Sequence, residues 1–370
     1  MKIVYLYSSL AITGGIERVL VDKMNYLVNH YGYDVYMITS DQGQHSVPYQ
    51  MDERIHLLDL QIRFHTRYRY RGWQRMKEAR KLSLLYHRRL QEKLEDIRPD
   101  IVVCTTIQDI HGLLHIIGTT PLVVESHSNF SHPDTWWHRL QIRINNFWIR
   151  RANVVITLTQ ADAVNWRRVN QNVHVIPNIV HLNDTGRYSD CSNKRAIFVG
   201  RLVEQKGLPD LIKVWRIVNG RHPEWQLDVY GDGQMNSIPE IKLFVHPSTK
   251  GVMEEYINSS MLLMTSIYEP FGLVLPEAMS CGLPVVAFDC PHGPADIITH
   301  ESNGFIVQDR DINRFADFVC QLIESPSLRQ TMGAAGIKAS QRYQADRIMS
   351  QWQDLFVSLT SKELSSKRTQ

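Results

Sequence analysis

The sequence is poor in cysteine, has no long apolar run and carries little net charge. Its five cysteines are scattered and form no Cys-x-x-Cys pair, which favours a reducing compartment and argues against structural zinc. No run approaches the roughly 18 consecutive apolar residues that a membrane-spanning helix needs. The apolar residues near the N-terminus lack a small-residue cleavage site after them, so we interpret them as a first strand. These absences predict a cytoplasmic protein.

The formal net charge of +3 is too small to indicate a binding partner. A chain of 370 residues is too long for one ordinary core and predicts two domains of comparable size. Short apolar runs alternate with helical patterns, as in α/β proteins with doubly wound parallel sheets. We expect domains at 1–178 and 194–344, a polar linker at 179–193, and a C-terminal helix with a polar tail at 345–370. That helix is expected to end near residue 359.

The most informative stretch runs from Glu269 to Glu277 and reads E-P-F-G-L-V-L-P-E. It follows an apolar run at 261–265 that predicts a buried parallel strand, and it leads into a helix that stops at Gly282. Pro276 is tolerated only in the first turn of a helix, so this helix is expected to begin near Leu273. The backbone N–H groups over 271–275 can then bind an anion, with Gly272 allowing close approach.

Two carboxylates flank this predicted anion site. Pro270 favours an extended conformation for Glu269 at the strand end, whereas Glu277 lies about one turn into the helix. Carboxylates beside a phosphate site suit the hydroxyl groups of ribose or of a sugar, so the stretch predicts a nucleotide-sugar pocket. The alternative is that the two glutamates are a surface cap and part of a solvated helix face.

Two further motifs accompany this stretch. Phe198-Val199-Gly200-Arg201-Leu202 precedes Gln205-Lys206-Gly207, and a glycine turn, Thr13-Gly14-Gly15-Ile16-Glu17-Arg18, follows the first strand. In this order the three motifs resemble those of the family 4 retaining glycosyltransferases, and together they cover most of the chain. The resemblance is to bacterial galactosyl- and N-acetylhexosaminyltransferases of capsule, exopolysaccharide and lipid-linked oligosaccharide synthesis.

The resemblance implies a GT-B fold, in which two Rossmann-like domains face a central cleft and the final helix crosses back to the first domain. It implies that a hexose or N-acetylhexosamine moves from a UDP-sugar to a saccharide or lipid-linked saccharide acceptor, with retention of configuration. It implies neither a cofactor nor a metal.

The resemblance also implies roles for individual residues. Glu269 would hold sugar hydroxyls and Glu277 the ribose, while Arg201 and Lys206 would neutralise the departing diphosphate. His127, at the carboxyl end of a predicted strand, would contact the sugar. The donor-binding residues expected from the three motifs are Gly14, Gly15, Gly200, Arg201, Lys206, Phe271, Gly272, Leu273, Val274 and Glu277. Without the resemblance, His127 could be structural and the two cations could form surface ion pairs.

Three further features bear on the donor and on metals. Only a short stretch separates Gly233 from the predicted strand at 242–245, so the helix usual in the family is expected to be reduced or absent, and the loop at 246–251 occupies the position that usually meets the base. The run Cys290-Pro-His-Gly-Pro resembles one in enzymes that use UDP-sugars, although Asp296 stands where glutamate is usual. Asp309-Arg310-Asp311 resembles the D-x-D metal motif of another fold, but a helical pattern follows, so we interpret Asp311 as a helix cap.

Basic and aromatic residues are mixed in two regions. Between Arg63 and Lys93, eleven Arg and Lys residues face only two Glu, and a similar cluster runs from Trp136 to Arg151. This mixture suits an anionic membrane surface, so we expect peripheral attachment at the inner face of the plasma membrane and no nucleic-acid partner. Single-stranded nucleic acid and a solvated helix after a mobile loop are the alternatives.

Two other functions stay open at this point. A sugar-nucleotide epimerase can share the same fold. A non-catalytic homologue could bind membrane or nucleic acid through the basic region without any dependence on a nucleotide.

Overall fold

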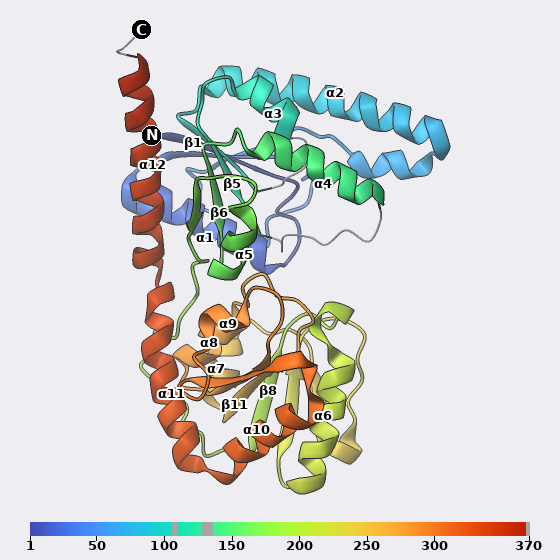
Figure 1. Cartoon of the computed structure of the whole chain (residues 1–370), viewed down its shortest axis with the longest axis vertical. Coiled ribbons are helices and arrows are strands. Elements are labelled where there is room, and N and C mark those ends of the chain that lie inside the picture. The colour runs from blue at the N-terminus through green and yellow to red at the C-terminus, as the bar shows by residue number, and fades with distance from the viewer. Residues whose placement is uncertain (106–109, 128–135, 368–370) are drawn as a thin grey trace. The chain divides into compact units, whose positions relative to one another are not determined.

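The computed structural model describes residues 1–105, 110–127 and 136–367, without the side chains of 136–139, 141 and 362–367. The chain divides into two compact units, whose elements are labelled in Figure 1. Unit 1 comprises Met1–Leu158, Asp162–Ile179 and Ile348–Gln370, and unit 2 comprises Thr159–Ala161 and Val180–Arg347.

Unit 1 is built on a parallel sheet with seven strands in its described part. They are β1 (Lys2–Tyr7), β2 (Asp34–Thr39), β3 (His56–Asp59), β4 (Ile101–Cys104), β5 (Leu122–Glu125), β6 (Val154–Thr157) and β7 (Val173–Val175). Their order is β3-β2-β1-β4-β5-β6-β7, so the direction in which strands are added reverses between β1 and β4. In register, Ile3 pairs with Val35 on one side and with Ile101 on the other.

The helices of unit 1 connect these strands and cover the sheet. They are α1 (Gly15–Tyr31), the 3-10 helix η1 (Phe64–Arg69), α2 (Gly72–Ile97), α3 (Ile110–Ile117), α4 (Trp136–Ile149), α5 (Gln160–Trp166) and α12 (Ala345–Lys367). By the division of the chain, α5 and α12 contribute residues to both units. Helix α1 presents Val19, Leu20, Met24 and Leu27 to the interior at the spacing of one helix face.

Unit 2 is built on a second parallel sheet, with six strands in its described part. They are β8 (Arg195–Val199), β9 (Gln226–Tyr230), β10 (Leu243–His246), β11 (Met261–Met264), β12 (Val285–Phe288) and β13 (Gly304–Val307). Their order is β10-β9-β8-β11-β12-β13, which is that of a dinucleotide-binding sheet. The reversal falls between β8 and β11.

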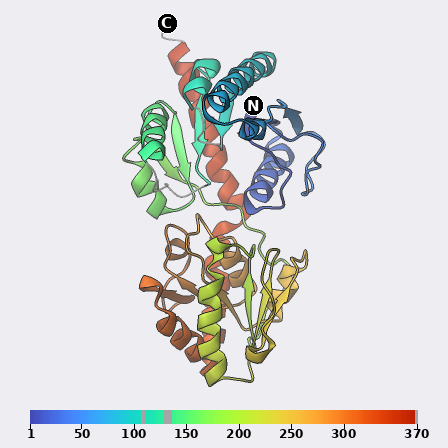
Figure 2. The ribbon, with the colours of Figure 1, turned by 90° about the vertical axis from the view of Figure 1, so that its right-hand side faces the viewer.

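Unit 2 contains six α-helices and four short 3-10 helices. They are η2 (Glu204–Lys206), α6 (Leu208–Arg221), η3 (Pro239–Ile241), α7 (Val252–Ile257), α8 (Val274–Ser280), α9 (Pro294–Ile297), η4 (Gln308–Arg310), α10 (Ile312–Glu324), α11 (Pro326–Ser340) and η5 (Gln341–Tyr343). Figure 2 shows α6, in yellow-green, lying along the strands of this unit. Its Trp215 is fully buried and donates its indole N–H to the Ile241 carbonyl at 2.8 Å.

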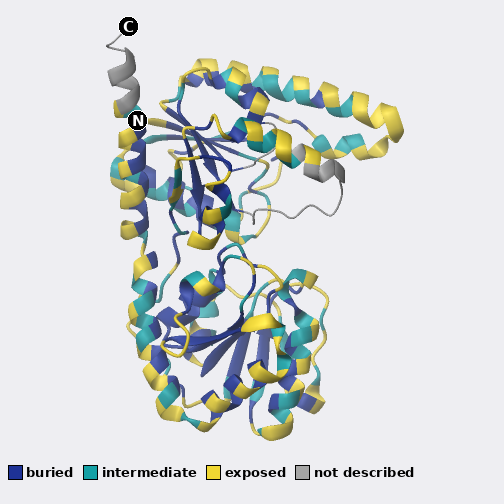
Figure 3. Ribbon diagram, viewed as in Figure 1, coloured by how far each residue is buried: buried dark blue, intermediate teal, exposed yellow. Residues whose placement is uncertain are grey.

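Each sheet forms the centre of its own hydrophobic core. The inner strands of both units are dark blue in Figure 3, as expected for parallel strands with both faces covered, whereas β3, β7 and β10 are only partly buried. Leu82, Leu90 and Leu94 of α2 join the core of unit 1, whereas residues 72–77 at the start of this helix are all exposed.

The predicted α/β fold is confirmed, and the predicted strands match the observed ones to within two residues at either end. Between β9 and β10 the described chain forms only the single turn η3, so the reduced connection is also confirmed. Strand β13 and helix α11 were not predicted. The predicted tail is wrong over 362–367, because α12 continues to Lys367 through a run that contains neither glycine nor proline.

Within residues 1–105, 110–127 and 136–367, no helix is both long enough and apolar enough to cross a bilayer.

The interpretation of Asp311 as a helix cap is confirmed, and it gives a first testable prediction. Its carboxylate accepts the backbone N–H of Arg314 at 3.0 Å, at the start of α10. Asp311→Ala should lower the free energy of unfolding by about 1 kcal/mol, measured by thermal or urea denaturation. Asp311→Asn keeps an acceptor oxygen and should remain close to wild type. Equal losses in both variants would contradict the capping role.

Candidate functional site

The loops that leave β8 and β11 meet where the strand order of unit 2 reverses. Parallel sheets of this kind bind ligands at that position, beyond the carboxyl ends of the strands. The loop after β8 carries Gly200, Arg201 and Lys206, and the loop after β11 carries Glu269 and Gly272. Hydrogen bonds join them: the Thr265 hydroxyl donates to the Lys206 carbonyl at 2.9 Å, and the Ile267 N–H donates to the Gln205 carbonyl at 2.8 Å.

An ion pair lies at the centre of this junction. The Lys206 ammonium donates to Oε2 of Glu269, which also accepts the Ser266 hydroxyl at 3.2 Å. The Lys206 side chain passes beside the Cα of Gly200, where a Cβ would lie 3.3 Å from Cε of the lysine. Both charged side chains are largely buried, so each depends on the other for compensation of its charge.

The segment before α8 presents backbone N–H groups as the sequence predicts. Helix α8 begins at Val274, one residue after the predicted start, and the Leu275 N–H donates to the Gly272 carbonyl at 3.0 Å. Within the described part of the chain, the N–H groups of residues 271–274 have no hydrogen-bond acceptor. Gly272 has φ of 93°, a left-handed conformation that favours glycine. The segment can therefore approach an anion through its backbone.

The remaining predicted residues of unit 2 differ in their environments. Glu277 is only 3% exposed, so it does not lie on a solvated helix face. Phe271 is buried, and its ring meets that of Tyr343 edge to face at 5.3 Å between centroids. Arg201 is exposed, and its guanidinium makes no ion pair or hydrogen bond with a described residue. Of the two predicted cations, Arg201 is thus the one available to a ligand without breaking an existing contact.

Arg310 is a part of this site that the sequence did not reveal. Its guanidinium donates to the carbonyls of Ser266 at 2.8 Å and Thr265 at 3.0 Å, and it pairs with Asp210 at 2.6 Å. These contacts fix the start of the loop that carries Glu269. In the sequence, Arg310 lies in the middle of Asp309-Arg310-Asp311, where only the two aspartates suggested a role.

The Cys290–Pro294 loop packs directly on the segment that carries Glu269. Glu269 and His292 form an isolated parallel bridge, and the Glu269 N–H donates to the Pro291 carbonyl at 3.4 Å. Gly293 lies so close that an added Cβ would stand 2.4 Å from the Phe271 oxygen and 2.7 Å from the Glu269 oxygen. The Cys290–Pro294 loop therefore contacts the backbone of Glu269 at both its N–H group and its carbonyl group.

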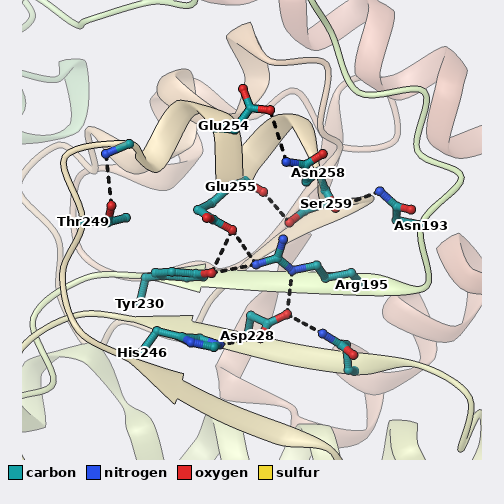
Figure 4. A network of polar contacts seen from close by, with 12 residues as sticks. Asn193, Arg195, Asp228, Tyr230, His246, Thr249, Glu254, Glu255, Asn258 and Ser259 are labelled. Atoms are coloured by element: carbon teal, nitrogen blue, oxygen red, sulfur yellow. Dashed lines mark hydrogen bonds and ion pairs between the residues drawn. The ribbon is translucent and has the colours of Figure 1, made fainter.

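A polar network lies at β8, β9, β10 and α7, and Figure 4 shows it. Arg195 donates to Asp228 at 2.6 Å, to Glu255 at 2.7 Å and to the Tyr230 hydroxyl at 2.9 Å. His246 lies 2.6 Å from the second oxygen of Asp228, and its ring stacks on Tyr230. Burial alone would raise the pKa of Asp228, but hydrogen bonds from Gln226 and His246 and the charge of Arg195 lower it.

The network orders the loop at 246–251 that was predicted to meet the base. His246 begins this loop, and Ser248 donates both its N–H, at 3.1 Å, and its hydroxyl, at 2.5 Å, to Asp232. Hydrogen bonds to the carboxylates of Asp228 and Asp232 thereby join β9 and its following loop to the end of β10 and the loop after it.

In unit 1, the glycine turn after β1 lies at the start of α1. Gly14 is the N-cap residue, and an added Cβ would lie 2.3 Å from a carboxylate oxygen of Glu17. Its carbonyl accepts the Tyr49 hydroxyl at 2.8 Å. Gly15 is exposed at the first helical position. Both glycines thus lie at the carboxyl end of β1, beside the reversal of strand order in this sheet.

His127 lies just beyond β5 and is buried against two charged residues that the sequence did not connect with it. Its Nε2 is 3.2 Å from Oε1 of Glu125, and the same oxygen accepts a hydrogen bond from the Lys23 ammonium. One detectable signal was Lys23 itself, which falls on the apolar face of α1 between Val19 and Leu27.

The basic and aromatic region of unit 1 forms a largely exposed surface on η1 and the start of α2. Trp73 and Met76 are about 70% exposed, and the guanidinium of Arg75 lies 4.6 Å from the centre of the Tyr68 ring. On α4, Leu140, Ile144 and Phe147 are exposed as well. The side chains of Trp136, Trp137, His138 and Arg139 lie outside the described residues.

No cluster of three or more His, Cys, Asp or Glu side chains among the described residues could hold a metal ion.

Comparisons with known proteins decide the family. A model for glycosyltransferase family 4 matches residues 13–184, and a model for glycosyl transferases group 1 matches residues 189–339. The chain belongs to the family 4 glycosyltransferases. The enzyme class and the family that the three sequence motifs indicated are thereby confirmed.

The glycosyltransferase matches relatives over nearly its whole length. It is 26% identical to an uncharacterized glycosyltransferase of Haemophilus influenzae and 27% identical to the amylovoran biosynthesis glycosyltransferase AmsD of Erwinia amylovora. Each alignment covers 96% of this chain and 99% of the relative. Its fold matches that of a mutant of S. aureus TarM with a TM-score of 0.76 at 16% identity, over 96% of this chain and 99% of the TarM chain. That TarM mutant was crystallised with fondaparinux, alpha-GlcNAc-glycerol and UDP.

The close contact at Gly293 gives a second prediction for the glycosyltransferase. Gly293→Ala would place a methyl group against the carbonyls of Glu269 and Phe271, and relief of that overlap should cost about 1–3 kcal/mol of stability. Thermal unfolding measures the loss. The matched control is Gly220→Ala near the end of α6, where an added Cβ would meet no other atom within 4 Å and which should be no less stable than wild type. A Gly293→Ala variant as stable as the control would contradict the tight packing of this loop.

Proposed function

We propose that this glycosyltransferase moves a hexose or N-acetylhexosamine from a UDP-sugar to a saccharide acceptor in the synthesis of a surface polysaccharide. The observation that carries the proposal is the junction of the loops after β8 and β11. There Arg201, the Lys206–Glu269 pair and the N–H groups of 271–274 belong to one end of one sheet. A diphosphate needs cations and N–H donors, and a sugar needs carboxylates, so this set suits the donor.

In the proposed reaction, the chain stabilises the charge that develops on the departing diphosphate. Arg201, Lys206 and the N–H groups near Gly272 would donate to its oxygens as its charge develops. Glu269 would accept sugar hydroxyls, and Glu277 would accept the ribose hydroxyls. From unit 1, His127 would contact the sugar, and the Gly14-Gly15 turn would lie against the diphosphate and the acceptor.

The donor and acceptor classes are proposed from three lines of support. UDP is present in the structure of the TarM mutant, whose fold this chain shares. AmsD, a relative that is matched over 99% of its length, is a glycosyltransferase of amylovoran biosynthesis. The loop from Cys290 to Pro294 resembles that of enzymes that use UDP-sugars. We include a lipid-linked acceptor and retention of configuration at the transferred sugar in the proposal, and no metal requirement.

Thermal unfolding with UDP, GDP, ADP or buffer tests the donor site. A ligand that binds only the folded protein adds about 2.7 kcal/mol at a hundred times its dissociation constant, which is a readily measured shift in Tm. UDP should give the largest shift, and Glu277→Ala should abolish the shift whatever its own Tm. Selective stabilisation by GDP or ADP would replace the UDP assignment, and no response to any nucleotide in a folded sample would refute the donor site.

Product analysis then separates the transferase from an epimerase. UDP-sugars that stabilise the protein should yield a glycosylated acceptor, whose anomeric configuration is read by NMR. An epimerised donor formed without any acceptor would instead support the epimerase.

We further propose that unit 1 attaches peripherally to an anionic membrane surface at the cytoplasmic face. The region from Arg63 to Lys93 combines exposed rings and apolar side chains with an excess of Arg and Lys, which fits lipid headgroups and their charge. The exposed apolar residues of α4 add to the same kind of surface within the cluster from Trp136 to Arg151.

Cosedimentation with vesicles tests this attachment. Phosphatidylglycerol vesicles should bind the protein and phosphatidylcholine vesicles should not, with binding weakened by salt. Arg75→Glu/Lys77→Glu should abolish binding, because each basic residue near the surface contributes about 1 kcal/mol. Arg216→Glu/Lys338→Glu makes the same charge change at exposed sites of unit 2 and should have little effect. Equal losses in both double variants, or binding to single-stranded DNA alone, would refute the proposal.

A further inference from the structure

Lys23, Glu125 and His127 form a buried polar chain in unit 1, of which the proposed reaction uses only His127. Lys23 lies in α1, Glu125 ends β5, and His127 follows two residues later. The side chains of Lys23 and Glu125 are each only 1% exposed. Lys23 and His127 both converge on one carboxylate oxygen, Oε1 of Glu125.

The remaining surroundings of Lys23 are aromatic. Its ammonium lies 4.0 Å from the centre of the Trp352 ring and 5.6 Å from that of Tyr5. Such rings attract a cation but carry no charge, so Glu125 is the anion that compensates Lys23 among the described residues. Burial alone would raise the pKa of Glu125, yet the charge of Lys23 and the proximity of both Lys23 and His127 as donors hold it at about 2. The carboxylate is therefore ionised at any pH at which the protein works.

Stability does not explain why such a pair is present. Taking two charges out of water is costly, and replacing a buried ion pair by apolar side chains of similar volume is often neutral or stabilising. What the pair does provide is a fixed anion beside Nε2 of His127. Neither ring nitrogen of His127 forms a hydrogen bond with a described residue, but Nε2 lies 3.2 Å from Oε1 of Glu125. An ionised carboxylate accepts hydrogen bonds and cannot donate them, so this proximity favours the proton on Nε2 and leaves Nδ1 for another partner.

We infer that Lys23 and Glu125 are positioning residues for His127. Lys23 fixes the Glu125 carboxylate, and Glu125 fixes the ring orientation and the Nε2–H tautomer, so that Nδ1 is the atom presented to the sugar substrate. This assignment rests on the proposed role of His127 at the sugar. It adds that two residues without substrate contact decide which nitrogen His127 offers.

The decisive comparison uses single and double variants. Lys23→Met or Glu125→Gln alone leaves one buried charge without its partner, so a lower Tm is expected from either one and proves nothing about function. Lys23→Met/Glu125→Leu removes both charges and should recover a Tm near that of wild type. In the double variant, kcat should nevertheless fall by about 10- to 100-fold, because a displaced group costs that much, while KM for the donor stays within about twofold.

A second measurement reports on the tautomer without any activity. Ring nitrogens are observed by NMR in protein labelled with ¹⁵N-histidine, and His127 is assigned among the 16 histidines as the signal lost in His127→Gln. Wild type should show Nε2–H, and both Glu125→Gln and the double variant should show a mixture of tautomers. A double variant with wild-type kcat, or with the wild-type tautomer, would overturn the inference.

The two proposals fail in different ways. If wild type neither responds to a nucleotide nor transfers a sugar, the proposed function is wrong, whatever the tautomer of His127. If UDP still stabilises the double variant and kcat is unchanged, the donor site stands and the positioning role is wrong.

Discussion

The ion pair between Lys206 and Glu269 is the contact on which the candidate donor site depends. It joins two loops that come from neighbouring strands but are separated by more than sixty residues of sequence. Ser266 and Arg310 then fix the same loop from its start, and the Cys290–Pro294 loop packs on its backbone. All these contacts are polar, because the carboxyl ends of a parallel sheet lie at the edge of the apolar core. The site is therefore held by charge and hydrogen bonds, which a charged ligand can share.

The elements that could be predicted are those whose sequence carries a local signal. Buried parallel strands appear as short apolar runs, and β2 and β12 were predicted to the residue. Helix α11 has no such signal, since small residues replace an apolar stripe. Gly333 approaches so closely that an added Cβ would lie 2.1 Å from the Gly282 oxygen. A helix that packs closely through glycine shows no periodic apolar pattern from which it could be predicted. Strand β13 was missed because it starts at a glycine and directly follows the polar run Glu301-Ser302-Asn303.

The residues of the candidate site also divide into those that a local motif reveals and those that only tertiary contacts reveal. Glu269, Glu277, Arg201 and Lys206 lie in two short motifs, so sequence alone could group them, although it could not show that Lys206 pairs with Glu269. Arg310 and Lys23 act through contacts with distant segments, and neither belongs to a motif for its role. A lysine on the apolar face of α1 was visible beforehand, but its partner Glu125 could be identified only once β5 was placed in the sheet. Long-range ion pairs are set by tertiary structure, which local spacing does not encode.

The ring of Trp352 over Lys23 has a consequence for the order of biosynthesis. Residues from Ile348 onward belong to unit 1, whose sheet is made from the first half of the chain. A ribosome thus releases α1 and β5 long before Trp352 exists, and in that interval Lys23 lacks the tryptophan ring that lies over it in the finished protein. Every residue of unit 2 precedes Ile348 in the chain. The first unit to emerge is therefore the last to be completed.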